Sequence, residues 1–109
     1  MNVLLSQDPV LKDFLDRIGA VRHRIHQATV FGSRARGTHQ FDSDYDLLLV
    51  VPKKDEVLLD TLYEAVIDVL LAHGRLISLK IYEEQEFARL QALQTPFMRR
   101  VVEEGVPLG

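Results

Sequence analysis

The chain has 109 residues, of which 47% are hydrophobic and 27% charged, and its formal net charge is −3. This length suits one domain around a single core, so we expect residues 1–109 to form one domain. The acidic balance excludes a global basic field that would attract nucleic acid. The sequence has no cysteine, which excludes disulfides, thiolate metal sites and thiol nucleophiles.

The N-terminal segment, MNVLLSQDPV, has neither a basic region nor a long apolar stretch, and so it is unlike a signal peptide. No apolar run approaches the roughly 20 residues that a membrane-spanning helix needs. These observations predict an intracellular, cytoplasmic protein with no membrane segment.

The first half of the chain is predicted to contain one helix and two strands. Asp8 and Pro9 suit the N-cap and the first helical position, and apolar residues then recur at helical spacing as far as the basic run VRHRIHQ. We expect this run to form the last turn of the helix, where cations complement the helix dipole; a docking surface for an acidic partner is the alternative. Residues 28–31 and 45–51 are predicted strands, and the continuous apolar character of the second predicts burial on both faces.

The second half is predicted to contain a helix over residues 55–73, a strand over 75–82 and helices over 83–93 and 95–105. The resulting order, α-β-β-α-β-α-α, predicts an α/β or α+β fold with helices on at least one face of a sheet. In the helices predicted over 55–73 and 95–105, the residues expected to face the core are Val57, Leu58, Leu62, Ala65, Val66, Val69, Leu70, Phe97, Val101 and Val102.

Two carboxylates stand at the start of the predicted strand 45–51. Asp44 and Asp46 are two residues apart, so both side chains are expected on one face, and Tyr45 on the other. Adjacent carboxylates repel each other unless a cation or a proton intervenes. Magnesium is commonly bound by one or two carboxylates together with the phosphates of a substrate. The pair therefore predicts a magnesium site.

A small-residue turn precedes these carboxylates. Gly32 lets backbone amides approach a ligand, and a helical turn beginning near Ser33 would offer free amides and a hydroxyl to an anion. Arg34 and Arg36 could neutralise phosphate charge. Gly-Ser alone is typical of a turn, and Asp-x-Asp alone of a solvated strand end. Their combination favours a site for a magnesium–nucleoside triphosphate.

The stretch FGSRARGTHQFDSDYDLLLVV resembles the signature of the nucleotidyltransferase superfamily related to DNA polymerase β, and most closely that of its minimal, single-domain (MNT-domain) members. The resemblance implies a nucleotidyltransferase fold with a small mixed sheet, ATP as the donor, and transfer of AMP to a protein hydroxyl. It also implies an antitoxin-like role beside a helical HEPN-domain partner. The residues that it implies are Gly32, Ser33, Arg34 and Arg36 for the nucleotide, and Asp44 and Asp46 for magnesium and catalysis.

Active members of this family carry a third carboxylate on the neighbouring strand. The matching strand, residues 75–82, offers Ser78 and Lys80 on the expected face and no acid. Serine is a weak magnesium ligand and a poor base, whereas Lys80 could pair with the aspartates or contact phosphate. Glu83 and Glu84, just past the strand, are candidates to substitute for the third carboxylate, but their spacing places them at the far end of the strand or in the next helix. The sequence is therefore consistent with two functions: an adenylyltransferase, or a catalytically impaired module that binds a nucleotide or neutralises a toxin by contact.

Partners of other kinds are less favoured by the sequence. No basic stripe with interleaved aromatic residues is present, so nucleic acid is not expected as the acceptor. The strand edges and the apolar tail GVPLG leave a homodimer open.

Overall fold

The computed structural model describes residues 7–32 and 44–108. The elements, in chain order, are α2 (Pro9–Arg17), the 3₁₀ turn η1 (Arg22–Arg24), β1 (Gln27–Phe31), β2 (Tyr45–Val51), α4 (Glu56–His73), β3 (Ile77–Glu83), α5 (Glu84–Leu93), α6 (Pro96–Glu104) and β4 (Val106–Pro107). The predicted order is confirmed, with η1 and β4 added to it. No helix in these two ranges combines the length and apolar character that crossing a membrane requires.

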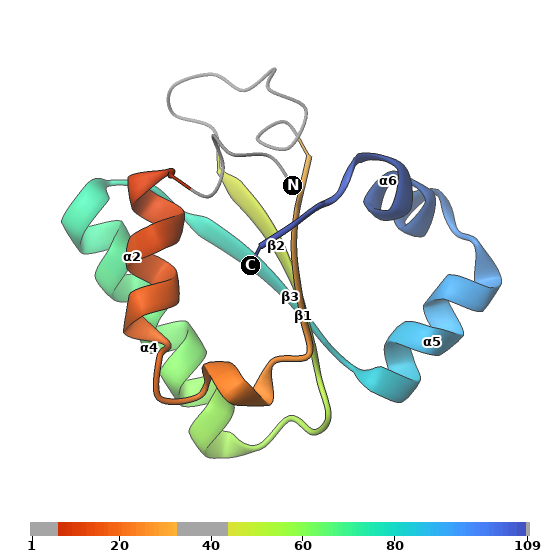
Figure 1. The fold of residues 1–109 in the computed structure, drawn as a ribbon, viewed down its shortest axis with the longest axis horizontal. Helices are drawn as coiled ribbons and strands as arrows, with labels where there is room; N and C mark the ends of the chain where they lie inside the picture. Colours follow the sequence, from red (N-terminus) through yellow and green to blue (C-terminus); the bar gives the residue numbers. More distant parts are fainter. Residues whose placement is uncertain (1–6, 33–43, 109) are drawn as a thin grey trace.

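The sheet has four strands in the order β3-β2-β1-β4. β2 and β3 are parallel and are connected through α4, whereas β1 is antiparallel to both β2 and β4. The sheet is therefore mixed, as the sequence resemblance implied. Helices α2 and α4 cover one face, and α5 and α6 cover the other (Figure 1).

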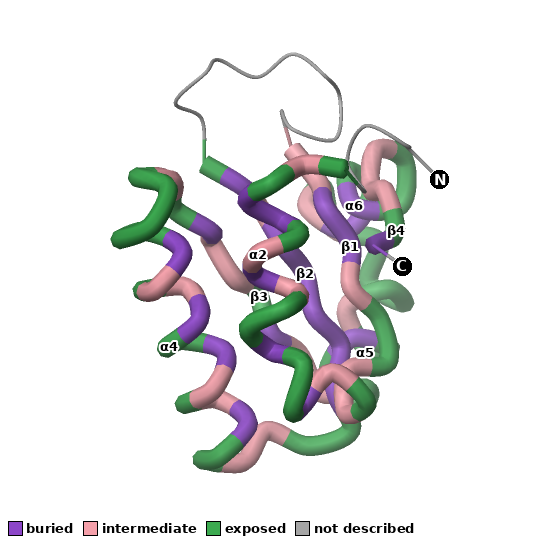
Figure 2. The backbone as a smooth tube through the Cα atoms, turned by 60° about the vertical axis from the view of Figure 1, so that its left-hand side comes forward, coloured by how far each residue is buried: buried purple, intermediate pink, exposed green. Residues whose placement is uncertain are grey.

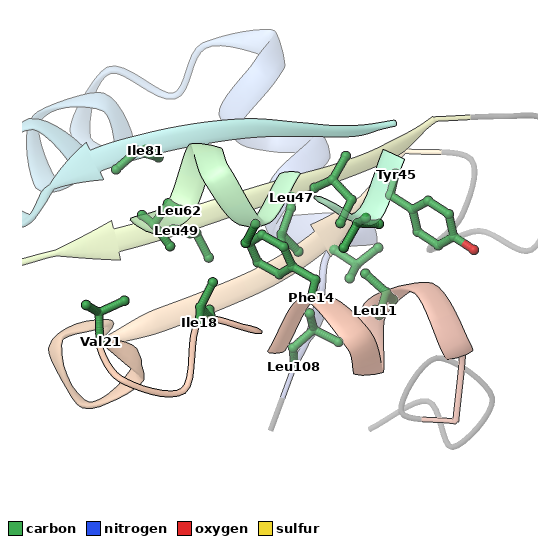
Figure 3. Packing of buried hydrophobic residues seen from close by; sticks show 14 of the residues in the cluster. Leu11, Phe14, Ile18, Val21, Tyr45, Leu47, Leu49, Leu62, Ile81 and Leu108 are labelled. Atoms are coloured by element: carbon green, nitrogen blue, oxygen red, sulfur yellow. The ribbon is translucent and has the colours of Figure 1, made fainter. Parts of the chain in front are cut away.

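β2 lies in the middle of the sheet and contributes to a core on each side, which confirms its predicted burial on both faces. Tyr45, Leu47 and Leu49 belong to the cluster that includes α2 and α4, and Figure 3 shows this cluster. Leu48 and Val50 belong to a second cluster, formed with α5 and α6. Because neighbouring residues of a strand point to opposite faces, the side to which each residue of β2 points is known.

The first helix is shorter than predicted, because α2 ends at Arg17 and the chain reaches β1 through η1. Glycine is a poor helix former, and Gly19 comes immediately after Ile18, the C-cap of α2. The basic run is therefore not a last helical turn. Its residue Arg24 forms an ion pair with Asp55, the N-cap of α4, and His26 hydrogen-bonds Glu84.

The apolar tail, which the sequence left open as a dimer contact, is part of the fold. Val106 pairs with Val30 in the sheet, and the Leu108 amide donates to the Ala28 carbonyl oxygen at 2.8 Å. Leu108 is buried in the core with α2. A two-residue strand is too short to produce a periodic sequence pattern, so it could not be predicted.

Three residues expected in the core are exposed. The side chains of Val57, Leu70 and Val102 are 68%, 41% and 70% exposed. The apolar stripe that packs against the sheet is narrower than the sequence pattern of α4 suggested. Its fully buried members are Leu58, Leu62, Ala65 and Val69.

Candidate functional site

The described part of the site lies where β1 ends and β2 begins. Phe31 of β1 is the cross-strand partner of Asp46 in β2, and Ser78 of β3 is its partner on the other side. Since Tyr45 and Leu47 point to the face covered by α2 and α4, Asp46 points to the face covered by α5 and α6. Ser33, Arg34 and Arg36 lie outside the described residues.

Gly32 follows β1 and lies against Asp46. Its φ of +77° is in the left-handed region that favours glycine. A Cβ atom added to Gly32 would come within 2.5 Å of the Asp46 Oδ2 atom. The glycine therefore brings the backbone that precedes Ser33 close to a carboxylate, and any side chain at this position would interfere with that approach. The approach of this backbone to a bound anion, which the sequence predicted, stays a prediction.

Asp44 and Asp46 differ in burial: Asp44 is exposed just before β2, and Asp46 is half-buried within it. Among residues 7–32 and 44–108, no three His, Asp or Glu side chains converge as a metal-binding group would. Two carboxylates still fit magnesium, which commonly takes one or two protein carboxylates and completes its shell with water and substrate phosphates. The residues present are thus compatible with magnesium bound together with a nucleotide, rather than by the protein alone.

Tyr45, between the two aspartates, fixes the start of β2 on the opposite face. Its ring is buried at one end of the core cluster (Figure 3). Its hydroxyl donates to Asp8, at 2.8 Å to Oδ2 and 3.0 Å to Oδ1. Asp8 is the N-cap of α2 and also accepts from the backbone amides of Val10 and Leu11. The link between Tyr45 and Asp8 was not predicted from the sequence. The available signal was a tyrosine in a buried strand, because a buried tyrosine hydroxyl usually has a hydrogen-bond partner.

The strand register distinguishes between the two candidates for the third-carboxylate position. Ser78 pairs directly with Asp46, whereas Lys80 pairs with Leu48, two residues further from the start of β2. Lys80 is exposed, and the ion pairs within the described ranges do not join it to Asp44 or Asp46. Ser78 is therefore the residue beside the carboxylate site.

The two glutamates considered as substitutes lie elsewhere. Glu83 pairs with Val51 at the far end of β2, and Glu84 hydrogen-bonds His26. This agrees with the expectation from their spacing that they belong to the other end of the strand.

An aromatic contact places the start of α6 on the same face as Asp46. The rings of Phe31 and Phe97 meet edge to face, with centroids 5.4 Å apart and planes at 87°. Phe97 lies in the first turn of α6, whose N-cap Thr95 accepts from the backbone amide of Met98. The last residue of β1, just before Gly32, is thereby packed against this helix.

Charged pairs away from the site hold the scaffold around β2. A hydrogen bond from Arg24 lowers the pKa of Asp55, as does the Leu58 amide, and the same pair raises the pKa of Arg24. A hydrogen bond with His73 is the main cause that lowers the pKa of Asp13. These contacts join η1 to the start of α4 and α2 to its end.

Comparisons with known proteins identify a family and a relative of this chain. The family described as polymerase beta, nucleotidyltransferase, matches residues 15–108. A relative from Methanocaldococcus jannaschii, named “Putative protein adenylyltransferase”, is 29% identical over 102 residues, which are 93% of this chain and 96% of the relative.

Two solved structures have a similar fold. A crystal structure of a toxin–antitoxin with AMP-PNP has a TM-score of 0.55 and 18% identity, over 92% of this chain and 70% of that one. A mutant of the toxin–antitoxin MntA-HpeT has a TM-score of 0.56 and 16% identity, over 91% and 71% of the two chains. At these identities the likeness shows the fold alone. Because the family match covers nearly the whole described chain and the fold agrees with it, the chain belongs to the polymerase beta nucleotidyltransferase family.

Proposed function

We propose that this protein is a magnesium-dependent nucleotidyltransferase that transfers AMP from ATP to a hydroxyl group of a protein partner. The observation that carries the proposal is the approach of Gly32 to Asp46, where a Cβ would come within 2.5 Å of the carboxylate oxygen. That approach brings a predicted anion-binding turn beside a predicted cation site in a chain of the nucleotidyltransferase family. A magnesium–nucleoside triphosphate carries negative phosphates for the anion-binding turn and a divalent cation for the carboxylates.

Each half of the site has a proposed role. Gly32 and Ser33 would hold the triphosphate, with Arg34 or Arg36 balancing its charge. Asp44 and Asp46 would hold magnesium, which when bound supplies charge neutralisation at the phosphate oxygens. The acceptor oxygen forms a bond to the α-phosphorus and loses its proton, and pyrophosphate leaves with the electron pair of the broken bond. The main contribution of the chain is then to position the two reactants.

The proposed acceptor is a helical HEPN-domain toxin, and the protein would act as its antitoxin. The name of the Methanocaldococcus jannaschii relative supports AMP as the transferred group and a protein as the acceptor. The structural neighbours support the setting, since both are toxin–antitoxin complexes and one contains an ATP analogue.

Ser78 favours a second candidate function. The residue that pairs with Asp46 on β3 is a serine, where active family members are expected to carry a carboxylate. A protein with two carboxylates could bind the nucleotide without transferring it, and could neutralise a toxin by contact alone. This would make the chain a binding module instead of an enzyme.

A labelling experiment separates the two functions. The protein is incubated with ATP labelled at the α-phosphate, magnesium and the product of the neighbouring gene, as the candidate acceptor, and label on that product is measured. We expect transfer, and at least a roughly hundredfold loss in Asp44→Asn/Asp46→Asn, since a metal contact is worth several kcal/mol in the transition state. Asp16→Asn, an exposed aspartate on α2, is the matched control. Binding of the partner without transfer would refute the adenylyltransferase proposal.

The substitution Ser78→Asp tests the role of the third position. It places a carboxylate beside Asp46, so we expect half-maximal transfer at a lower magnesium concentration than in the wild type. Lys80→Asp, two residues further along β3, should not give this gain. If only Ser78→Asp transfers label while the wild type binds the partner without labelling it, the binding module is the correct function.

A further inference from the structure

Helix α4 and the segment just after it carry most of the large apolar side chains that are exposed in the described chain. Eight large apolar side chains are exposed in residues 7–32 and 44–108, and six of them lie on α4 or in the segment just after it. Single exposed apolar residues are common, but a group of them on one element marks an interaction surface. The six are Val57, Tyr63, Ile67, Leu70, Leu71 and Leu76.

Four of these residues form a stripe. Tyr63, Ile67, Leu70 and Leu71 recur at the spacing i, i+4, i+7 and i+8, so they share one side of the helix. Their exposed fractions are 50%, 56%, 41% and 79%. Leu76, 41% exposed, follows after the helix ends at Gly74. We call these five residues, Tyr63, Ile67, Leu70, Leu71 and Leu76, the α4 patch.

The patch lies on the side of α4 that faces away from the sheet. Figure 2 shows exposed segments along the outer side of α4 and buried segments along its inner side. The inner side already has its packing partners, because Leu58, Leu62, Ala65 and Val69 are buried in the core. The apolar residues on the outer side of α4 are therefore not needed for its packing against the sheet.

An acidic border runs beside the patch. Glu56, Asp60 and Glu64 are spaced four residues apart and are all exposed. Asp60 precedes Tyr63 by three residues, and Glu64 precedes Ile67 by three, which makes them neighbours on the helix surface. The ion pairs formed within the described ranges include none of these three acids. Their charges are thus available to a partner.

The basic groups at the end of α4 already have partners. The His73 Nε2 atom lies 2.9 Å from Asp13, and the Arg75 guanidinium donates to the Gly74 carbonyl oxygen at 3.0 Å and has further interactions within the chain. A second copy of this chain would therefore bring another acidic border to the patch, with few cations to balance it. A partner of opposite charge fits this surface better.

We propose that the α4 patch docks an amphipathic helix of another protein whose apolar stripe is bordered by Lys and Arg. Helices pack through interlocking side-chain ridges, and a partner helix of this kind would cover the apolar stripe and pair its cations with Glu56, Asp60 and Glu64. The patch and Asp46 lie on opposite sides of the sheet, so a docked helix leaves the nucleotide site open. The inference does not depend on the proposed catalytic activity.

Two synthetic helical peptides test the proposal. Both are as long as α4, 18 residues, with one leucine stripe; one borders it with lysine and the other with glutamate. Binding to the full chain is followed by fluorescence anisotropy of the labelled peptide. We expect the lysine peptide to bind more tightly, with an affinity that falls as salt rises.

Variants locate the binding surface. Ile67→Ser/Leu71→Ser should weaken binding of the lysine peptide by about tenfold or more, since two apolar anchors are lost. The control Leu93→Ser/Val102→Ser removes two equally exposed apolar residues outside the patch and should change binding by less than about twofold. Asp60→Asn/Glu64→Gln should reduce the salt dependence, whereas Asp16→Asn/Glu103→Gln, with the same charge change elsewhere, should not.

Three results would overturn the proposal. One is equal binding of the lysine and glutamate peptides, and another is an equal loss in the patch variant and its control. The third is self-association in sedimentation velocity that Ile67→Ser/Leu71→Ser abolishes, because the occupant would then be a second copy of this chain. Circular dichroism of each variant shows whether its fold is retained.

Discussion

Two glycines adopt the same unusual backbone conformation in very different surroundings. Gly32 has a φ of +77° and Gly74 a φ of +67°, and both values favour glycine over other residues. A Cβ at Gly74 would meet nothing within 4 Å, whereas a Cβ at Gly32 would lie 2.5 Å from the Asp46 carboxylate. Gly74 ends helix α4. Gly32 follows strand β1 and leaves room for Asp46, a candidate metal ligand.

This difference predicts separable effects of two alanine substitutions. Gly74→Ala and Gly32→Ala should each lower the free energy of unfolding by about 1 kcal/mol through backbone strain. The carboxylate of Asp46 can rotate away from the new methyl group, so Gly32→Ala should not destabilise much more. It should, however, weaken binding of magnesium–AMP-PNP in calorimetry, and Gly74→Ala should not. Equal nucleotide affinity in the two variants would contradict the role given to Gly32.

At the scale of elements, the N-terminal end of α4 is held by a charged contact of its N-cap residue. Asp55 caps the helix by accepting from the Leu58 amide at 2.9 Å and pairs with Arg24 of η1. Both contacts favour the ionised carboxylate and lower its pKa below the ordinary value of 3.8. In the unfolded chain the pKa returns to the ordinary value. The contact therefore stabilises the fold above that value, and its contribution is lost as the pH falls through the lower folded pKa.

Substitution of this carboxylate should change how the free energy of unfolding falls at acid pH. Asparagine can still cap a helix but has no charge to lose, so Asp55→Asn should show a smaller fall in unfolding free energy below about pH 4 than the wild type. Urea unfolding at a series of pH values measures this. Arg24→Gln should likewise reduce this fall, whereas Asp16→Asn, which caps no helix, should leave it unchanged. If the unfolding free energies of Asp55→Asn and the wild type fall in parallel with pH, the charged contact does not contribute to stability.

Local signals were enough to predict most elements. Asp8, Asp55 and Thr95 cap their helices as their residue types indicate, and Gly74 ends α4 in the left-handed conformation. The first helix was predicted too long because Ile18 and Val21 continue its apolar period and are indeed buried, but from the turn that follows the helix. The spacing of apolar residues reflects which residues are buried, and a buried turn after a helix can continue the same spacing.

At the scale of the whole molecule, the last residues complete both the sheet and the core. Val106 and Pro107 pair with β1, and Leu108 is only 8% exposed within the cluster that contains α2 and α4. Their strand, β4, is an edge strand of the sheet and lies beside β1. The end of the chain is thus joined to β1, the strand that leads to Gly32.

This arrangement predicts a stabilising role for the tail. Leu108→Ala should lower the free energy of unfolding by about 2–3 kcal/mol, because it removes buried methyl groups and leaves a cavity. Leu93→Ala, at a leucine that is 65% exposed, should change it by less than about 0.5 kcal/mol. Urea unfolding measures both. A small effect of Leu108→Ala would show that the tail does not contribute to the core.

The sequence by itself determined the family, the element order and the central strand, because caps, apolar periods and the spacing from Gly32 to Asp46 are local features. Only the tertiary structure decided which residues are neighbours across strands. Register places Ser78, and not Lys80, beside Asp46, and it brings Leu108 to β1. It also joins Tyr45 to Asp8 and leaves the outer side of α4 exposed. Such contacts join residues far apart in the chain, and their partners follow from packing, which no local pattern encodes.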